Sequence, residues 1–255
     1  MDLDNIVWNE ENYNLFVEQI KNLRKKEKMI SQRKIIRNGK SVKIVKIPLL
    51  KEMAEKISLG NWEQFLLLKP KIKYAEETIV IGLVIGNIKN DYNRAEKYIN
   101  YYMPLIDSPF IVDVFTSSLS IIKENRKKFF FIGKKWLKSD NPYLVRAGYA
   151  IFAKHFNTRE YIDELKYMAV SVRTKDKNII AAVASLIVSI YLFDKKKGYE
   201  FFLTDRELID KEIFKKAAYT LSNSPSIPME QKKSIKILAG INTKTSKDLS
   251  DDFGY

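Results

Sequence analysis

Apolar residues recur at spacings of three and four from about residue 48 onward, and the breaks between them are about one helix length apart. Prolines mark the expected helix edges, because proline suits the first turn of a helix and disrupts its interior. The pair Asn141-Pro142 joins an N-cap residue to proline at the first helical position, and Ser108-Pro109 repeats this arrangement. The pattern predicts about twelve helices, over residues 10–27, 48–58, 61–69, 74–88, 91–102, 109–122, 126–138, 142–156, 158–171, 177–192, 207–223 and 228–239.

Only one segment alternates between apolar and polar residues as a strand does, from Val42 to Ile47. An extended lead-in to Pro48 explains this alternation equally well, because the residue before a proline avoids the helical region. The last fourteen residues, 242–255, are polar and are expected to form a flexible tail. Residues 1–241 are expected to form a single domain.

Many short amphipathic helices with few glycines indicate an all-α protein. Helices of this length in unbroken succession favour stacked helix pairs, that is, an α-solenoid of HEAT-like repeats. The pairs show little sequence similarity to one another, so a compact all-α domain stays open as the alternative.

Composition narrows the chemistry further. The chain contains no cysteine, which excludes disulfides, zinc ribbons and cysteine nucleophiles. The single histidine, His155, argues against histidine-based metal sites and against a Ser-His-Asp triad. The longest apolar stretches, such as Ile179–Phe193, are too short and too polar to span a bilayer. We therefore expect a cytoplasmic, nucleoid-associated monomer with no metal and no cofactor.

The charge is high and unevenly distributed. The chain carries 45 Lys and Arg against 31 Asp and Glu, a net charge of +14. Residues 21–46 hold eleven basic residues and one acidic residue, so this segment alone has a net charge of +10. A second basic cluster covers residues 123–138. Such a block points to a polyanionic partner, and the excess of lysine over arginine favours contacts with phosphates over the reading of bases.

Five segments resemble, in the same order, those of the AlkD-like DNA alkylation repair proteins, which are HEAT-like-repeat DNA glycosylases. The segment Tyr102–Leu119, YMPLIDSPFIVDVFTSSL, is similar to the stretch that carries the family's catalytic aspartate. The other four are Val45–Pro48 with the LLKEMAEKI that follows, Glu77–Lys89, Tyr143–Phe156 and Phe214–Ser224. The resemblance covers residues 20–240. It implies a crescent of helical repeats whose concave, basic face binds double-stranded DNA.

The resemblance also implies site residues. Asp113 takes the position of the family's aspartate, which stabilises the positively charged sugar as an alkylated purine leaves. Lys46, Arg146, Lys215 and Lys216 take the place of DNA-binding residues. A helix over residues 109–122 would place Asp113 on a polar stripe with Thr116, Ser117 and Ser120, away from the core.

Two tryptophans that form the family's lesion cleft are replaced. Pro109 stands at the first of these positions and Leu186 at the second, and neither side chain can stack on a base. The tryptophans of this chain, Trp8, Trp62 and Trp136, are interpreted as packing residues. Three hypotheses follow: an alkylpurine glycosylase that uses Asp113, a family member that binds DNA without excising bases, and a helical scaffold for an acidic protein.

Overall fold

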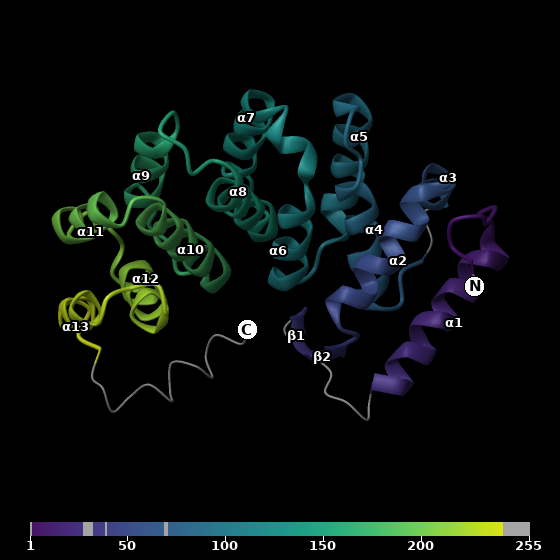
Figure 1. Ribbon diagram of the computed structural model, residues 1–255, viewed down its shortest axis with the longest axis horizontal. Coiled ribbons are helices and arrows are strands. Elements are labelled where there is room, and N and C mark those ends of the chain that lie inside the picture. The colour runs from purple at the N-terminus through teal and green to yellow at the C-terminus, as the bar shows by residue number, and fades with distance from the viewer. Residues whose placement is uncertain (1, 28–32, 39, 69–70, 242–255) are drawn as a thin grey trace. The chain divides into compact units, whose positions relative to one another are not determined.

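The computed structural model describes residues 2–27, 33–38, 40–68 and 71–241, and over these residues the regular secondary structure is helical apart from one short hairpin (Figure 1). The prediction of an all-α protein is therefore confirmed. The chain divides into two compact units, unit 1 over residues 1–125 and unit 2 over residues 126–255, and each is described by itself. The prediction of a single domain over 1–241 stays a prediction, and the predicted tail, 242–255, lies outside the described residues.

Unit 1 holds six α-helices, two short 3-10 helices and one β-hairpin among its described residues. They are α1 (Glu10–Glu27), β1 (Arg33–Arg37), β2 (Lys40–Ile44), α2 (Ile47–Leu59), α3 (Trp62–Leu67), α4 (Ala75–Gly86), α5 (Tyr92–Tyr102), η1 (Met103–Leu105), α6 (Pro109–Ser118) and η2 (Ser120–Lys123). Helix α4 is buried along its whole length and packs against α2, α5 and α6. Helices α2, α4 and α6 thus form a row, with α3 packed on α2 and α5 on α4.

Two adjacent glutamates are buried in α4. The carboxylate of Glu76 accepts hydrogen bonds from Arg24 of α1, at 3.0 and 3.2 Å, and from the Val45 amide, at 3.1 Å. Glu77 accepts a hydrogen bond from the Tyr13 hydroxyl at 2.8 Å. Burial, followed by the charge of Glu77, raises the pKa of Tyr13 well above its usual range. These bonds attach α1 and the start of α2 to the central helix.

Unit 2 contains the helices α7 (Arg126–Trp136), α8 (Pro142–His155), α9 (Ile162–Val170), α10 (Lys177–Phe193), α11 (Lys195–Thr204), α12 (Lys211–Asn223) and α13 (Met229–Leu238). Helix α10 packs against α8, α9, α11 and α12, while α7 packs on α8 and α13 on α12. Helices α8, α10 and α12 therefore form a second row within this unit. No helix of the described chain is long and apolar enough to span a membrane.

The hairpin corrects the predicted strand. The strand expected over Val42–Ile47 is β2, which begins earlier and ends at Ile44, and it pairs with β1, which the sequence analysis did not predict. Ile47 already begins α2. The signal for the hairpin was the pair Asn38-Gly39, because Asn-Gly between apolar runs is typical of a tight hairpin turn. Asn38 has a φ of 46°, in the left-handed region that such a turn requires.

Two helix predictions also need correction. Helix α11 was not predicted, and the helix expected over 207–223 begins only at Lys211. The sequence of α11 begins with three lysines and contains Gly198. In the structure Asp194 caps this helix by accepting from the amides of Lys196 and Lys197, at 3.2 and 3.1 Å. A Cβ at position 198 would overlap the Tyr191 backbone, so the glycine permits close packing of α11 on α10.

Candidate nucleic-acid interface

The outward face of the hairpin carries two opposed lysines. Lys34 of β1 is the cross-strand partner of Lys43 of β2, and both side chains are exposed. Like charges placed directly opposite in an antiparallel pair destabilise it. Neither lysine forms an ion pair with any described residue. Ile36 lies on the same face and is 46% exposed, whereas Ile35 and Ile44 on the other face are buried. An anionic partner would relieve the repulsion between the two lysines.

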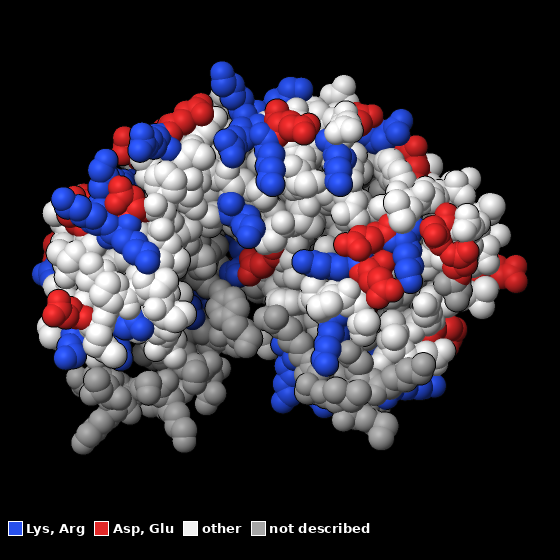
Figure 2. All heavy atoms as spheres, in the orientation of Figure 1, with Lys and Arg blue, Asp and Glu red and all other residues white. Residues whose placement is uncertain are grey.

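The hairpin is fixed to the segment that precedes α6. The Arg37 guanidinium forms an ion pair with Asp107 at 2.6 Å, and the Asn38 amide donates to the Asp107 carbonyl at 3.2 Å. Strand β1 packs against α6, the helix that contains Asp113. Figure 2 shows Lys and Arg side chains at the edge of unit 1 where Figure 1 draws the hairpin. Lys46 is exposed at the N-cap position of α2, directly after β2.

The helix predicted over 109–122 is interrupted, because α6 ends at Ser118 and Ser120 begins the 3-10 helix η2. The Asp113 side chain on α6 is half-buried, and Ser117 and Ser120 are exposed. Thr116 is the exception, because it is buried and its hydroxyl donates to the Val112 carbonyl of the preceding turn at 2.9 Å. Pro109 occupies the first turn of α6, but the hydroxyl of Ser108 forms no cap bond and has no hydrogen-bond partner among the described residues.

Two further predicted DNA-binding residues come together in unit 2. Arg146 of α8 and Lys216 of α12 are 4% and 7% exposed, and both of their helices pack against α10. Arg146 donates a hydrogen bond to the Asn178 carbonyl, in the first turn of α10, at 3.0 Å. Burial, followed by the positive charge of Arg146, lowers the pKa of Lys216 to about 8. Lys215, the adjacent residue, is exposed.

The charges of Arg146 and Lys216 therefore interact with each other. Asp113 and Lys46 belong to unit 1, whereas Arg146, Lys215 and Lys216 belong to unit 2. The crescent with one concave, basic face stays a prediction. No group of three or more acidic or histidine side chains among the described residues could hold a metal ion.

Pro109 and Leu186, which stand where the AlkD-like proteins have tryptophans, differ in their surroundings. Pro109 is half-buried at the beginning of α6. Leu186 is completely buried in the core of unit 2, on α10, so an indole at this position would not fit without moving its neighbours. Among the tryptophans of this chain, Trp8 and Trp136 are buried, in agreement with a packing role. Trp62 differs from both, because it is half-exposed and lines a pocket.

No protein-family model matches this chain, and no curated protein or solved structure matches it either. The resemblance to the AlkD-like proteins therefore rests on the residues of this chain alone.

Proposed function

We propose that the protein binds double-stranded DNA through its phosphates and is a divergent, AlkD-like helical-repeat protein that does not excise bases. The observation that carries this proposal is the exposed pair Lys34 and Lys43, opposed on the hairpin in a segment with a net charge of +10. Duplex DNA carries one negative charge per about 1.7 Å of its axis, so closely spaced lysines can each meet a phosphate. The rows α2–α4–α6 and α8–α10–α12 support the helical-repeat part of the proposal, because repeats stack in this way.

The hairpin lysines provide the test. Replacement of Lys34, Lys40 and Lys43 by glutamine is expected to lower the slope of log affinity against log salt by about 3, because about one counterion is released for each phosphate contact. The measurement is fluorescence anisotropy of a labelled duplex over a range of salt concentrations. Unrelated duplex sequences should be affected equally, because phosphates carry no sequence information.

A triple variant on α7 and the residues directly after it serves as the matched control. Lys127, Lys135 and Lys138 are also exposed and form no ion pair with any described residue, so their replacement by glutamine removes the same charge. This variant should keep a salt slope closer to that of the wild type. Equal losses in both variants would show that net charge alone drives binding and would contradict a role for the hairpin. Absence of duplex binding by the wild type at about 50 mM salt would contradict the proposal itself and favour an acidic protein partner.

A second prediction concerns pH and unit 2. Lys216 is charged below a pH of about 8 and loses its charge above it, whereas an ordinary lysine keeps its charge to about pH 10. The salt slope of the wild type should therefore fall by about 1 between about pH 7 and about pH 9.5. In a Lys216→Gln variant the slope should be the same at both pH values. A wild-type slope that does not change with pH would exclude Lys216 as a phosphate contact.

A further inference from the structure

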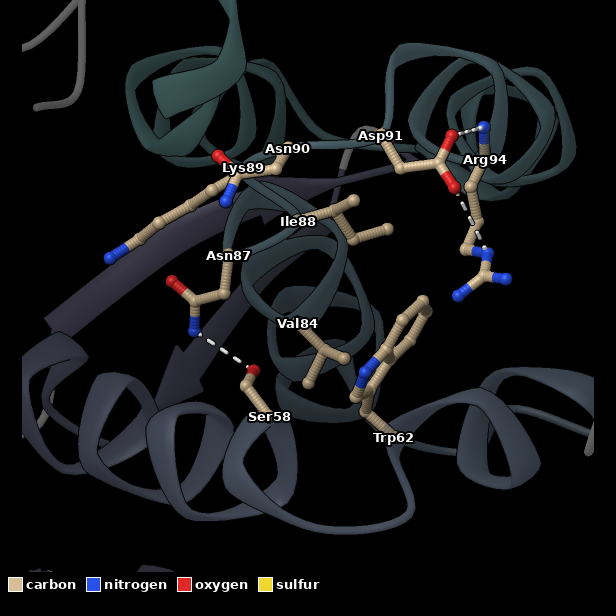
Figure 3. Close-up of a pocket in the computed structure, with 9 residues that line it drawn as sticks. All are labelled: Ser58, Trp62, Val84, Asn87, Ile88, Lys89, Asn90, Asp91 and Arg94. Atoms are coloured by element: carbon tan, nitrogen blue, oxygen red, sulfur yellow. Dashed lines mark hydrogen bonds and ion pairs between the residues drawn. The ribbon is translucent and has the colours of Figure 1, made fainter.

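A pocket of about 260 Å³ lies in unit 1 (Figure 3). The end of α2 and the start of α3 form one side of it, and the end of α4 and the start of α5 form the other. Val84 and Ile88 supply apolar surface, and Trp62, Asn87 and Arg94 supply an aromatic ring, an amide and a guanidinium. This volume is close to the lower end of small-molecule sites, which suits one ring system with an attached group.

The ring of Trp62 is held in place beside this pocket. It packs edge-on against Tyr98 of α5, with ring centroids 5.8 Å apart, and the Tyr98 hydroxyl donates to Glu63 at 2.8 Å. In Figure 3 the indole stands next to Val84 and faces the pocket. A fixed, half-exposed indole beside apolar side chains is a surface on which a planar ring can stack. Packing alone does not require this exposure, as the buried Trp8 and Trp136 show.

Arg94 brings a positive charge to the same indole. Its guanidinium carbon lies 5.9 Å from the centre of the Trp62 ring. The Nε of Arg94 forms ion pairs with Asp91, which also lines the pocket, and with Glu63, at 3.4 and 3.8 Å. The guanidinium forms no side-chain hydrogen bond with the part of the chain that the structure describes. Both ion pairs are made through Nε, so the two terminal nitrogens can still donate to an anionic group of a ligand, and a phosphate is the group whose geometry they match.

Asn87 adds a polar edge on the side opposite Trp62 (Figure 3). Its amide nitrogen donates to the Ser58 hydroxyl at 3.0 Å, which orients the side chain. This bond leaves the second amide hydrogen and the amide oxygen for a ligand. An asparagine amide with one donor and one acceptor matches the N7 and N6 edge of adenine.

We propose that this pocket binds a single adenine nucleotide, whose base stacks on Trp62 and contacts Asn87 while its phosphate binds Arg94. The nucleotide can be a free mononucleotide or the 5′-terminal nucleotide of a single strand, since both present the same base and phosphate. This inference does not depend on duplex binding by the hairpin.

The test is calorimetric titration of the whole protein with AMP, adenosine, inorganic phosphate and a 5′-phosphorylated single-stranded pentanucleotide. We expect AMP to bind at least about tenfold more tightly than adenosine or phosphate, because both the ring and the anion contribute. Tighter binding of the pentanucleotide than of AMP would identify a strand end as the ligand, and the reverse would identify a free nucleotide. Absence of AMP and pentanucleotide binding up to about 5 mM, or equal affinities for AMP and phosphate, would overturn the proposal.

Variants locate the site. Arg94→Gln should weaken AMP binding about tenfold and leave adenosine binding unchanged, because it removes only the contact to phosphate. Trp62→Leu should weaken both about tenfold. Arg206→Gln is the matched control, since Arg206 is an exposed arginine of unit 2 that is paired with Glu207 at 2.8 Å. Far-UV circular dichroism shows whether each variant is folded. Full AMP affinity in a folded Arg94→Gln variant would overturn the assignment of the phosphate contact and with it the proposed site.

Discussion

Replacement of Glu76 by alanine is expected to lower the free energy of unfolding of unit 1 by about 3–5 kcal/mol, the usual cost of removing one partner of a buried ion pair. Glu76 has no exposed surface, and its carboxylate is the acceptor for both Arg24 and the Val45 amide. Its removal leaves a buried amide without an acceptor and places the positive charge of Arg24 beside a cavity. The measurement is urea denaturation followed by indole fluorescence in a Trp136→Phe background, in which only Trp8 and Trp62 of unit 1 report.

The control for this variant is Glu52→Ala. Glu52 forms an ion pair with Lys56 at 2.8 Å on the exposed face of α2, and both side chains are at least half exposed. Its loss should cost less than about 1 kcal/mol, because water screens exposed pairs. Glu76→Gln should lie between the two, since it keeps an acceptor for Val45 and removes only the charge. A cost for Glu76→Ala as small as that for Glu52→Ala would show that the buried pair contributes little.

Helix positions in this chain could be predicted where local chemistry determines them. Asn141 caps α8 by accepting from the Tyr143 amide at 2.9 Å, and Pro142 follows at the first helical position, as expected. Asp176 likewise caps α10, which begins at the predicted residue. These contacts join residues two or three positions apart, so the sequence alone contains both partners.

Features that depend on distant partners could not be predicted. The burial of Glu76 and Glu77 is such a feature, because their partners Arg24 and Tyr13 lie 52 and 64 residues away in sequence. The hairpin is a different case, because its turn signal, Asn38-Gly39, is local and can be recognised in the sequence. Helix α11 could not be predicted across Gly198, because a glycine that permits close packing and one that ends a helix look the same in a sequence.

The candidate site was predicted only in part, for the same reason. The resemblance gave Arg146 and Lys216, which the structure brings close enough for the charge of one to lower the pKa of the other. The resemblance could not show how the side chains at positions 109 and 186 are oriented. Only the structure shows that Leu186 is buried. Trp62 was interpreted as packing, like the other two tryptophans, because a sequence does not show which aromatic side chains border a pocket.

Release of 7-methylguanine or 3-methyladenine from methylated duplex DNA is expected to be slow or absent. Each stacking contact with a cationic base contributes roughly 1–2 kcal/mol, so the loss of two lowers the rate by one to three decades, at about 1.4 kcal/mol per decade. Pro109 serves as the first residue of α6, and Leu186 is enclosed in the core of unit 2. Neither position offers an aromatic face that could hold the sugar against the Asp113 carboxylate.

The test compares base release by the wild type, by Asp113→Asn and by Pro109→Trp. The last variant is chosen because position 109 is half-buried at a helix start, whereas an indole at the buried position 186 would disrupt unit 2. Rapid release by the wild type that disappears in Asp113→Asn would refute the expectation and identify Asp113 as a catalytic residue. Release by Pro109→Trp alone would show that Asp113 keeps a productive position and that the missing ring limits the reaction. Absence of release from all three, together with normal duplex binding, would support DNA binding without base excision. In that case no positively charged sugar is positioned beside Asp113, so its carboxylate has no charge to stabilise.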